Sequence, residues 1–144
     1  MAATAWTKSL ALLLFNPLCA QSDRQQEIFE EAHNFNVVIL AGTQRWRREA
    51  LEQRRVGSTR VYDAGWRTGA LTNRSTGMLI ALQGKLRGAQ VLGVREPPEE
   101  LCGRRLALDI QHHDTVITIV SYYCPPQPKT TANRKQYMAT VGRL

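Results

Sequence analysis

The sequence of 144 residues lacks several features that would mark a specialised class of protein. It contains no apolar run near the roughly 18 residues that a membrane-spanning helix requires, which excludes a spanning protein. Its three cysteines, Cys19, Cys102 and Cys124, are few and scattered, and no CxxC or CxxH pair occurs. A disulfide scaffold and a structural zinc site are therefore not expected. The remaining composition, 43% hydrophobic and 22% charged, is that of a single globular domain.

Positive charge is plentiful and unevenly distributed. The whole chain has a net charge of +7. Residues 1–42 contain two basic and four acidic residues and carry −2, so residues 43–144 carry +9. Arginine dominates this charge, and seven arginines fall close together: Arg45, Arg47, Arg48, Arg54, Arg55, Arg60 and Arg67. Guanidinium groups bind phosphate oxygens bidentately, so this segment favours a nucleic acid or another phosphate-bearing partner. The alternative is a solvated basic surface.

The first twenty residues have two interpretations. Lys8, the apolar run that follows it and the small residue Ala20 resemble a short secretory signal. Residues 10–15 also fit a buried first strand that ends in the turn Asn16-Pro17, since proline biases its predecessor toward an extended backbone. The strand is favoured, because a helix and a second strand follow it.

The pattern after Ser22 is that of a mixed α/β protein. Ser22 and Gln25 form a capping-box signature for a helix, and the β-branched run at 37–41 is typical of a strand buried on both faces. Residues 44–58 fit either a polar helix or a loop. Further strands are expected at 60–66, 77–82, 89–95, 104–112 and 115–123, and a last helix at 131–144.

These elements predict one mixed sheet, parallel at its start and antiparallel afterwards. Two amphipathic helices would cover one face of it. The strands at 37–41 and 115–123 are apolar on both sides, so the other face would remain uncovered. We therefore expect the isolated chain to self-associate or to bind hydrophobic dyes.

The order of several short motifs then points to a family. In chain order these motifs are Phe15-Asn16, the following helix, Val37–Gln44, the Gly-rich strand at 68–82 and Thr115-Val-Ile-Thr-Ile-Val-Ser-Tyr-Tyr-Cys-Pro-Pro. This order resembles the endonuclease/exonuclease/phosphatase superfamily, and within it the apurinic-type endonuclease domain of non-LTR retrotransposons. The resemblance covers residues 9–144 and the N-terminal half of that domain. It implies a single partial domain over 1–144, similar to the first half of a four-layer α/β sandwich.

The resemblance also implies a chemistry. The family hydrolyses phosphodiesters with a bound Mg²⁺ that a carboxylate holds, and donor groups stabilise the charge of the transition state. Asn16 matches the asparagine that orients the surroundings of the ion, and Tyr123 matches the tyrosine that faces the scissile phosphate. Arg45, Arg47, Arg48 and Arg67 would flank the nucleic-acid groove. Considered without the family, Asn16 is a turn residue before proline and Tyr123 a common strand-end residue.

The chain departs from the family at two points. Gly42 occupies the position of the metal-holding glutamate, and glycine offers no ligand. Gln44 would reach that position only after a register shift of two, and a neutral amide binds Mg²⁺ weakly. The motifs that supply the general base and the phosphate-clamping histidine would follow Leu144. We therefore expect this chain alone to bind no Mg²⁺ and to hydrolyse nothing.

Other interpretations remain open at this stage. A non-catalytic protein that binds nucleic acid, DNA rather than RNA, through the basic segment is the main alternative; an intracellular, nuclear location would suit it. A small secreted protein cleaved after Ala20 is the third. His112, His113 and Asp114 indicate a solvated hairpin turn and not a metal site, because adjacent strand residues point to opposite faces. A register slip of one residue would exchange Tyr122, expected to pack, with Tyr123.

Overall fold

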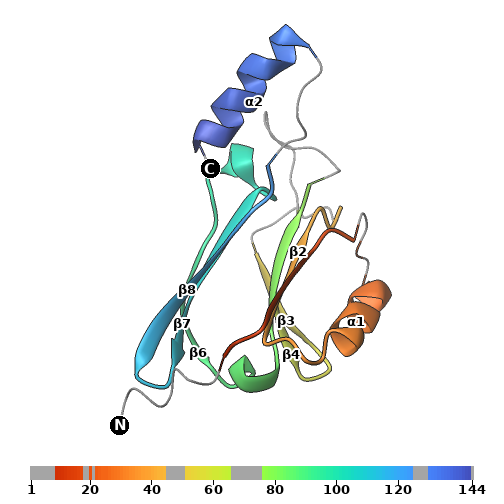
Figure 1. Ribbon diagram of the computed structural model, residues 1–144, viewed down its shortest axis with the longest axis vertical. Helices are drawn as coiled ribbons and strands as arrows, with labels where there is room; N and C mark the ends of the chain where they lie inside the picture. Colours follow the sequence, from red (N-terminus) through yellow and green to blue (C-terminus); the bar gives the residue numbers. More distant parts are fainter. Residues whose placement is uncertain are drawn as a thin grey trace.

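A computed structural model describes residues 9–17, 20, 22–44, 51–65, 76–124 and 130–143. Two β-sheets lie face to face, and a helix covers the outer face of the larger one (Figure 1). The larger sheet has the strand order β1-β2-β5-β4-β3 and the smaller one β6-β7-β8. The elements are β1 (Leu12–Phe15), α1 (Ser22–Glu31), β2 (Val37–Ala41), β3 (Glu52–Val56), β4 (Thr59–Gly65), β5 (Met78–Leu82), β6 (Gln90–Arg95), β7 (Arg105–His112), β8 (Thr115–Tyr122) and α2 (Thr131–Arg143).

The chain begins with the β-α-β unit that the sequence predicts. β1 and β2 are parallel, with Leu12 opposite Val37, and α1 connects them. Asn36 fixes the start of this pair: its backbone N–H donates to the carbonyl of Ala11 at 2.7 Å, and its side-chain oxygen accepts from the Ala11 N–H at 3.0 Å. Leu12–Phe15 is thus a strand, as the favoured interpretation of the first twenty residues predicts, but the prediction that this strand is buried is wrong, because Leu12, Leu14 and Phe15 are exposed at the sheet edge. All other strand pairs are antiparallel.

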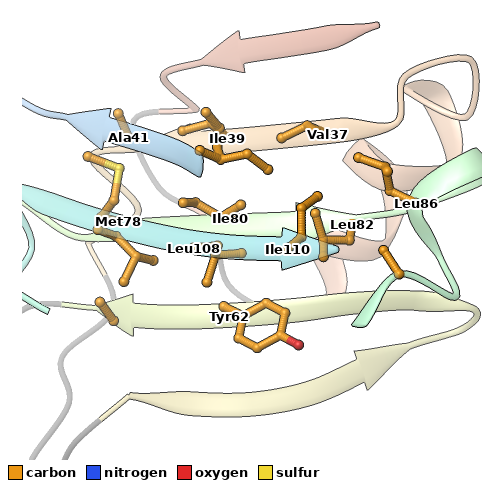
Figure 2. Packing of buried hydrophobic residues seen from close by; sticks show 14 residues of the cluster. Val37, Ile39, Ala41, Tyr62, Met78, Ile80, Leu82, Leu86, Leu108 and Ile110 are labelled. Atoms are coloured by element: carbon orange, nitrogen blue, oxygen red, sulfur yellow. The ribbon is translucent and has the colours of Figure 1, made fainter. Parts of the chain in front are cut away.

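β2 is buried on both faces, as its continuous apolar run predicts. Val37, Ile39 and Ala41 face the smaller sheet, where they join the larger core cluster. Figure 2 shows the centre of this cluster, with side chains of β7 over those of β5 and β2. Val38 and Leu40 face α1 and pack with Phe29 and Ala32 of the helix and its following turn. Burial of these apolar surfaces stabilises the three layers.

The prediction of one mixed sheet is wrong, because the strands divide between two sheets. After β5 the chain turns through a short 3₁₀ helix, η2 (Gly84–Leu86), and enters the second sheet at β6. Leu86 is fully buried in the shared core. Period-two alternation tells which side chains share a face but not which sheet a strand joins, so the sequence could not reveal this step. The broad α/β class holds, with three layers among the described residues.

The uncovered apolar surface also lies elsewhere than predicted. Both faces of the larger sheet are covered, one by α1 and one by the smaller sheet. Large apolar side chains are instead exposed on β1 and on the outer side of the smaller sheet: Leu12, Leu14, Phe15, Leu92, Val116, Val120 and Tyr122. The outer side of the smaller sheet also carries polar contacts: Asp109 forms an ion pair with Arg95 at 2.8 Å and accepts a hydrogen bond from the Thr118 hydroxyl at 2.7 Å.

The final helix forms as predicted but covers neither sheet. α2 lies beyond the ends of β7 and β8 (Figure 1). Its apolar residues Met138 and Val141 are 61% and 37% exposed. Neither described helix combines the length and the apolar character that a bilayer span needs.

The hairpin of β3 and β4 is missed by the interpretation of residues 44–58 as helix or loop. Glu52–Arg55 carries no β-branched residue, so its composition does not favour a strand. The two-residue turn Gly57-Ser58, with Gly57 at φ 59°, was the available signal. Arg54 of β3 binds the buried carboxylate of Asp63 at 3.3 Å and also donates to the side-chain oxygen of Gln25. Gln25 in turn donates to the carbonyl of Ala20 at 2.7 Å, so it ties α1 to the hairpin and to the preceding loop.

Replacing Arg54 by Met should lower the free energy of unfolding by about 3 kcal/mol, because it removes an ion pair from the fully buried Asp63 carboxylate. Urea denaturation followed by circular dichroism measures the effect. Adding Asp63→Asn to Arg54→Met should restore much of the stability, since the amide keeps an acceptor for the Gly65 N–H without the charge. A double variant no more stable than Arg54→Met would contradict the account.

Two buried threonines offer a matched comparison. The hydroxyl of Thr43 has no hydrogen-bond partner among the described residues, whereas that of Thr59 donates to Gln83 Oε1 at 3.0 Å. Thr43→Val should therefore raise the free energy of unfolding by about 1 kcal/mol, and Thr59→Val should lower it by about 1–2 kcal/mol. Thermal melts of both variants beside the wild type test this, and equal shifts of the same sign would refute it.

Candidate functional site

Three segments that are far apart in the sequence meet at one end of the sandwich. Asn16 follows β1, Gly42 follows β2 and Tyr123 follows β8. A Cβ atom placed on Gly42 would lie 3.0 Å from Oδ1 of Asn16 and 3.3 Å from the hydroxyl oxygen of Tyr123. The amide and the phenol therefore flank the same point. The three positions that the family resemblance selects lie together, and two of them come from one sheet and one from the other.

Gly42 directly follows β2 and continues its pairing with β5. Its N–H donates to the carbonyl of Gly77 at 2.8 Å, and the N–H of Gln44 donates to that of Thr76 at 2.9 Å, which extends the pairing of β2 with β5. Gly42 has φ 72°, in the left-handed region that favours glycine. Gln44 has φ 59° and is exposed. A residue with a side chain at 42 would meet both backbone strain and the side chain of Asn16.

Arg104, which precedes β7, contacts Tyr123 through both its backbone and its side chain. Its backbone carbonyl accepts the N–H of Tyr123 at 2.7 Å, and its guanidinium donates to the Tyr123 carbonyl at 3.2 Å. The guanidinium carbon lies 5.9 Å from the centre of the Tyr123 ring, within the range of a cation–π contact. Desolvation by burial lowers the pKa of Arg104, while Coulombic interactions with Tyr123 and Cys124 oppose the shift. Arginine remains cationic under such shifts, so this end of the sandwich holds a buried positive charge.

Glycines allow the two sheets to approach each other beneath the site. The N–H of Gly77, just before β5, donates to the carbonyl of Gly103 at 3.1 Å, and this bond joins the segments that enter the two sheets. A Cβ on Gly103 would lie 2.7 Å from the carbonyl oxygen of Gly65. Real Cβ atoms do not come so close to a backbone atom, so only glycine fits here. The buried hydroxyl of Ser121 adds a contact of 2.8 Å to the sulfur of Met78 across the same interface.

The donors at this site do not fit Mg²⁺. Mg²⁺ is held in proteins mainly by carboxylate oxygens, and the described site offers an amide oxygen, a phenol and no carboxylate. The buried guanidinium of Arg104 lies beside Tyr123. Over the described ranges as a whole, no three His, Cys, Asp or Glu side chains are grouped so that they could hold an ion.

The arginines predicted to contact nucleic acid, Arg45, Arg47, Arg48 and Arg67, lie outside the described residues. Their segments, 45–50 and 66–75, adjoin described residues at the same end of the sandwich as Tyr123. Gln44 and Thr76 are hydrogen-bonded to each other there, and the carbonyl of Gly65 approaches Gly103.

Predictions for other residues can also be compared with the structure. The Tyr123 hydroxyl lies beside Asn16 and Gly42, whereas Tyr122, which was expected to pack, is 50% exposed on the outer side of the smaller sheet. His113-Asp114 is the hairpin turn expected between β7 and β8. Arg104 was not singled out, and its available signal was the pair Gly103-Arg104 at the start of an alternating strand.

Comparisons with known proteins do not identify the chain: no family model matches it, and no curated protein matches its sequence.

The crowding at Gly42 can be measured against Gly57, which has a similar φ of 59° but no atom within 4 Å of the place that a Cβ would take. Gly57→Ala should cost about 1 kcal/mol of unfolding free energy through backbone strain alone. Gly42→Ala should cost measurably more, because its methyl group also meets Asn16 and Tyr123. Urea denaturation of the two variants makes the comparison, and equal losses would show that the site is not packed as described.

Proposed function

We propose that this chain is related to the divalent-metal-dependent phosphodiester hydrolases and binds nucleic-acid phosphate without cleaving it. In this proposal Asn16 and Tyr123 contact the phosphodiester, and Arg104 holds Tyr123 in place. The chain would correspond to the first half of the four-layer sandwich of that family. DNA is the proposed nucleic acid, in keeping with an intracellular, nuclear location.

The observation that carries the proposal is the convergence at Gly42. Asn16 and Tyr123 were selected from motif order alone, and 107 residues separate them in the chain. Their side-chain oxygens nevertheless flank one point, 3.0 and 3.3 Å from where a Cβ on Gly42 would lie. The approach of two polar side chains from different sheets to one point supports a shared binding site.

Electrostatics supports an anionic ligand. Arg104 is 4% exposed and lies against Tyr123, and the net charge of residues 43–144 is +9. Phosphodiesters accept hydrogen bonds from a phenol and from an amide N–H, and they gain from a nearby cation in a partly desolvated site. The predicted contacts Arg45, Arg47, Arg48 and Arg67 would extend this binding along the nucleic-acid backbone.

Hydrolysis is not proposed, because the family's reaction requires a carboxylate-held metal. Gly42 supplies no ligand at the position concerned, and catalytic groups that act as a unit lose most of their effect when one is removed. Binding of the phosphodiester, and not its cleavage through a bound Mg²⁺, is therefore the activity that these residues support.

Binding is tested by fluorescence anisotropy with a labelled 20-nucleotide DNA duplex, with the same duplex in RNA as comparison. Affinity should fall steeply with salt, as expected for phosphate contacts. Tyr123→Phe should weaken binding about 5-fold by removing one hydrogen bond to the phosphate, and Tyr122→Phe is the matched control that should not. Equal affinities of the two variants would remove Tyr123 from the interface, and salt-independent binding would refute phosphate recognition.

Cleavage is tested separately by incubating the protein and MgCl₂ with supercoiled plasmid. We expect no nicking above that of the Tyr123→Phe variant. Nicking by the wild type that Tyr123→Phe abolishes would show that the chain is an active nuclease and would overturn the non-hydrolytic part of the proposal.

A further inference from the structure

Both sheets end in an open strand on the same side of the sandwich. Among the described residues, β1 pairs only with β2, and β8 pairs only with β7. Neither strand carries a charged residue or a proline, the features that usually protect an exposed edge from pairing with another chain. Large side chains of both strands are between 41% and 61% exposed: Leu12, Leu14, Phe15, Val116, Val120 and Tyr122.

The two edges enclose an apolar cleft. It measures about 320 Å³ and is lined by Leu10, Leu12, Val37, Leu86 and residues 117–120 of β8. A second apolar groove, of about 250 Å³, runs on the other side of β1, between that strand and α1, and is lined mainly by Leu13, Phe15, Ile28 and Phe35. A strand that pairs with the open edge of β1 would place alternate side chains on these two sides. The edge therefore accepts a strand that is apolar on both faces.

β1 and β8 run in the same direction. Asn16 follows β1, Tyr123 follows β8, and both lie against Gly42 at one end of the sandwich. A twofold axis that lies in the open side and runs parallel to the strands would place a second copy against it. It would bring β1 of one copy beside β8 of the other in parallel orientation, and β8 beside β1 at the same time. Each larger sheet would then continue into the smaller sheet of the second copy.

We propose that two copies of this chain associate through this side, with β1 of each copy paired to β8 of the other. The inner residues of β8, Ile117 and Ile119, meet Leu12 and Leu14. Its outer residues Val116 and Val120 cover the groove between β1 and α1. The dimer has four layers: helix, two extended sheets and helix.

A second copy of the chain fits this surface, because the surface has two open edges, β1 and β8, and both must be paired at once. Any partner must offer two strands with apolar side chains on both faces, placed as β1 and β8 are placed, and a second copy does so by symmetry. No charged residue of either strand has to be desolvated. The half-exposed side chains of the two strands supply on the order of 500 Å² per copy at typical side-chain areas. The backbone atoms of the two new strand pairs add to this buried area and bring it toward the roughly 800 Å² per partner of a standard interface.

Sedimentation velocity of the full chain from about 1 to 100 µM tests the proposal, since this range spans ordinary dimer affinities. The wild type should reach twice the 16.2 kDa of one chain. Leu14→Lys and Val120→Lys should each raise the dimer dissociation constant by about 100-fold or more, because every dimer then buries two ammonium groups. Met138→Lys is the matched control: Met138 is 61% exposed, as Leu14 is, but lies on α2, and its replacement should leave the dimer intact.

The outcomes separate this arrangement from others. A dimer that Leu14→Lys disrupts and Val120→Lys does not would indicate pairing of β1 with β1, and the opposite result would indicate stacking of the outer faces of the smaller sheet; either overturns the proposal. A wild type that stays monomeric at about 100 µM, a concentration far above ordinary dimer dissociation constants, also overturns it. Circular dichroism checks that each variant is folded, and the milder Leu14→Ser replaces Leu14→Lys if that variant is not. DNA binding by the Tyr123 site is measured independently, so failure of one proposal leaves the other standing.

Discussion

The close approach of three backbone segments at one end of the sandwich is the constraint on which the rest of the structure depends. Gly77 donates to Gly103 at 3.1 Å, and a side chain on Gly103 would collide with the carbonyl of Gly65. Since these segments lead into strands of both sheets, a larger residue would push the sheets apart there. Asn16 and Gly42 belong to one sheet and Tyr123 to the other, so their meeting depends on this glycine-lined contact.

The sandwich separates two kinds of surface. Polar groups and the buried charge of Arg104 gather at the end where β1, β2 and β8 terminate. Apolar groups are exposed along the side where β1 and β8 form open edges among the described residues. In the two proposals the first surface binds a phosphodiester and the second pairs with another strand, since an unprotected edge accepts backbone hydrogen bonds. The two proposals therefore concern different parts of the molecule.

The residue at position 42 limits the chemistry that the site can support. A carboxylate at position 42 would create negative charge beside Asn16 and Tyr123 and would suit a divalent cation. Glycine adds no charge at this position. The guanidinium nearby is that of Arg104, which lies 5.9 Å from the centre of the Tyr123 ring and is desolvated by its surroundings. The left-handed backbone at Gly42 and its contact with Asn16 also make a side chain costly at this position. In the proposed function, the geometry of a phosphate site thus persists without the donors of a metal site.

Local patterns in the sequence determined much of this protein. Apolar periodicity predicted β2, β5, β7 and β8 within a residue or two, and the motif order selected Asn16 and Tyr123. Tertiary structure decided what such patterns do not encode. Alternation specifies a face but not a sheet, so the division into two sheets at η2 could not be predicted. It depends on contacts between residues distant in the chain, whose energies no local window contains. The polar strand β3 and Arg104 had only weak local signals, the turn Gly57-Ser58 and the pair Gly103-Arg104.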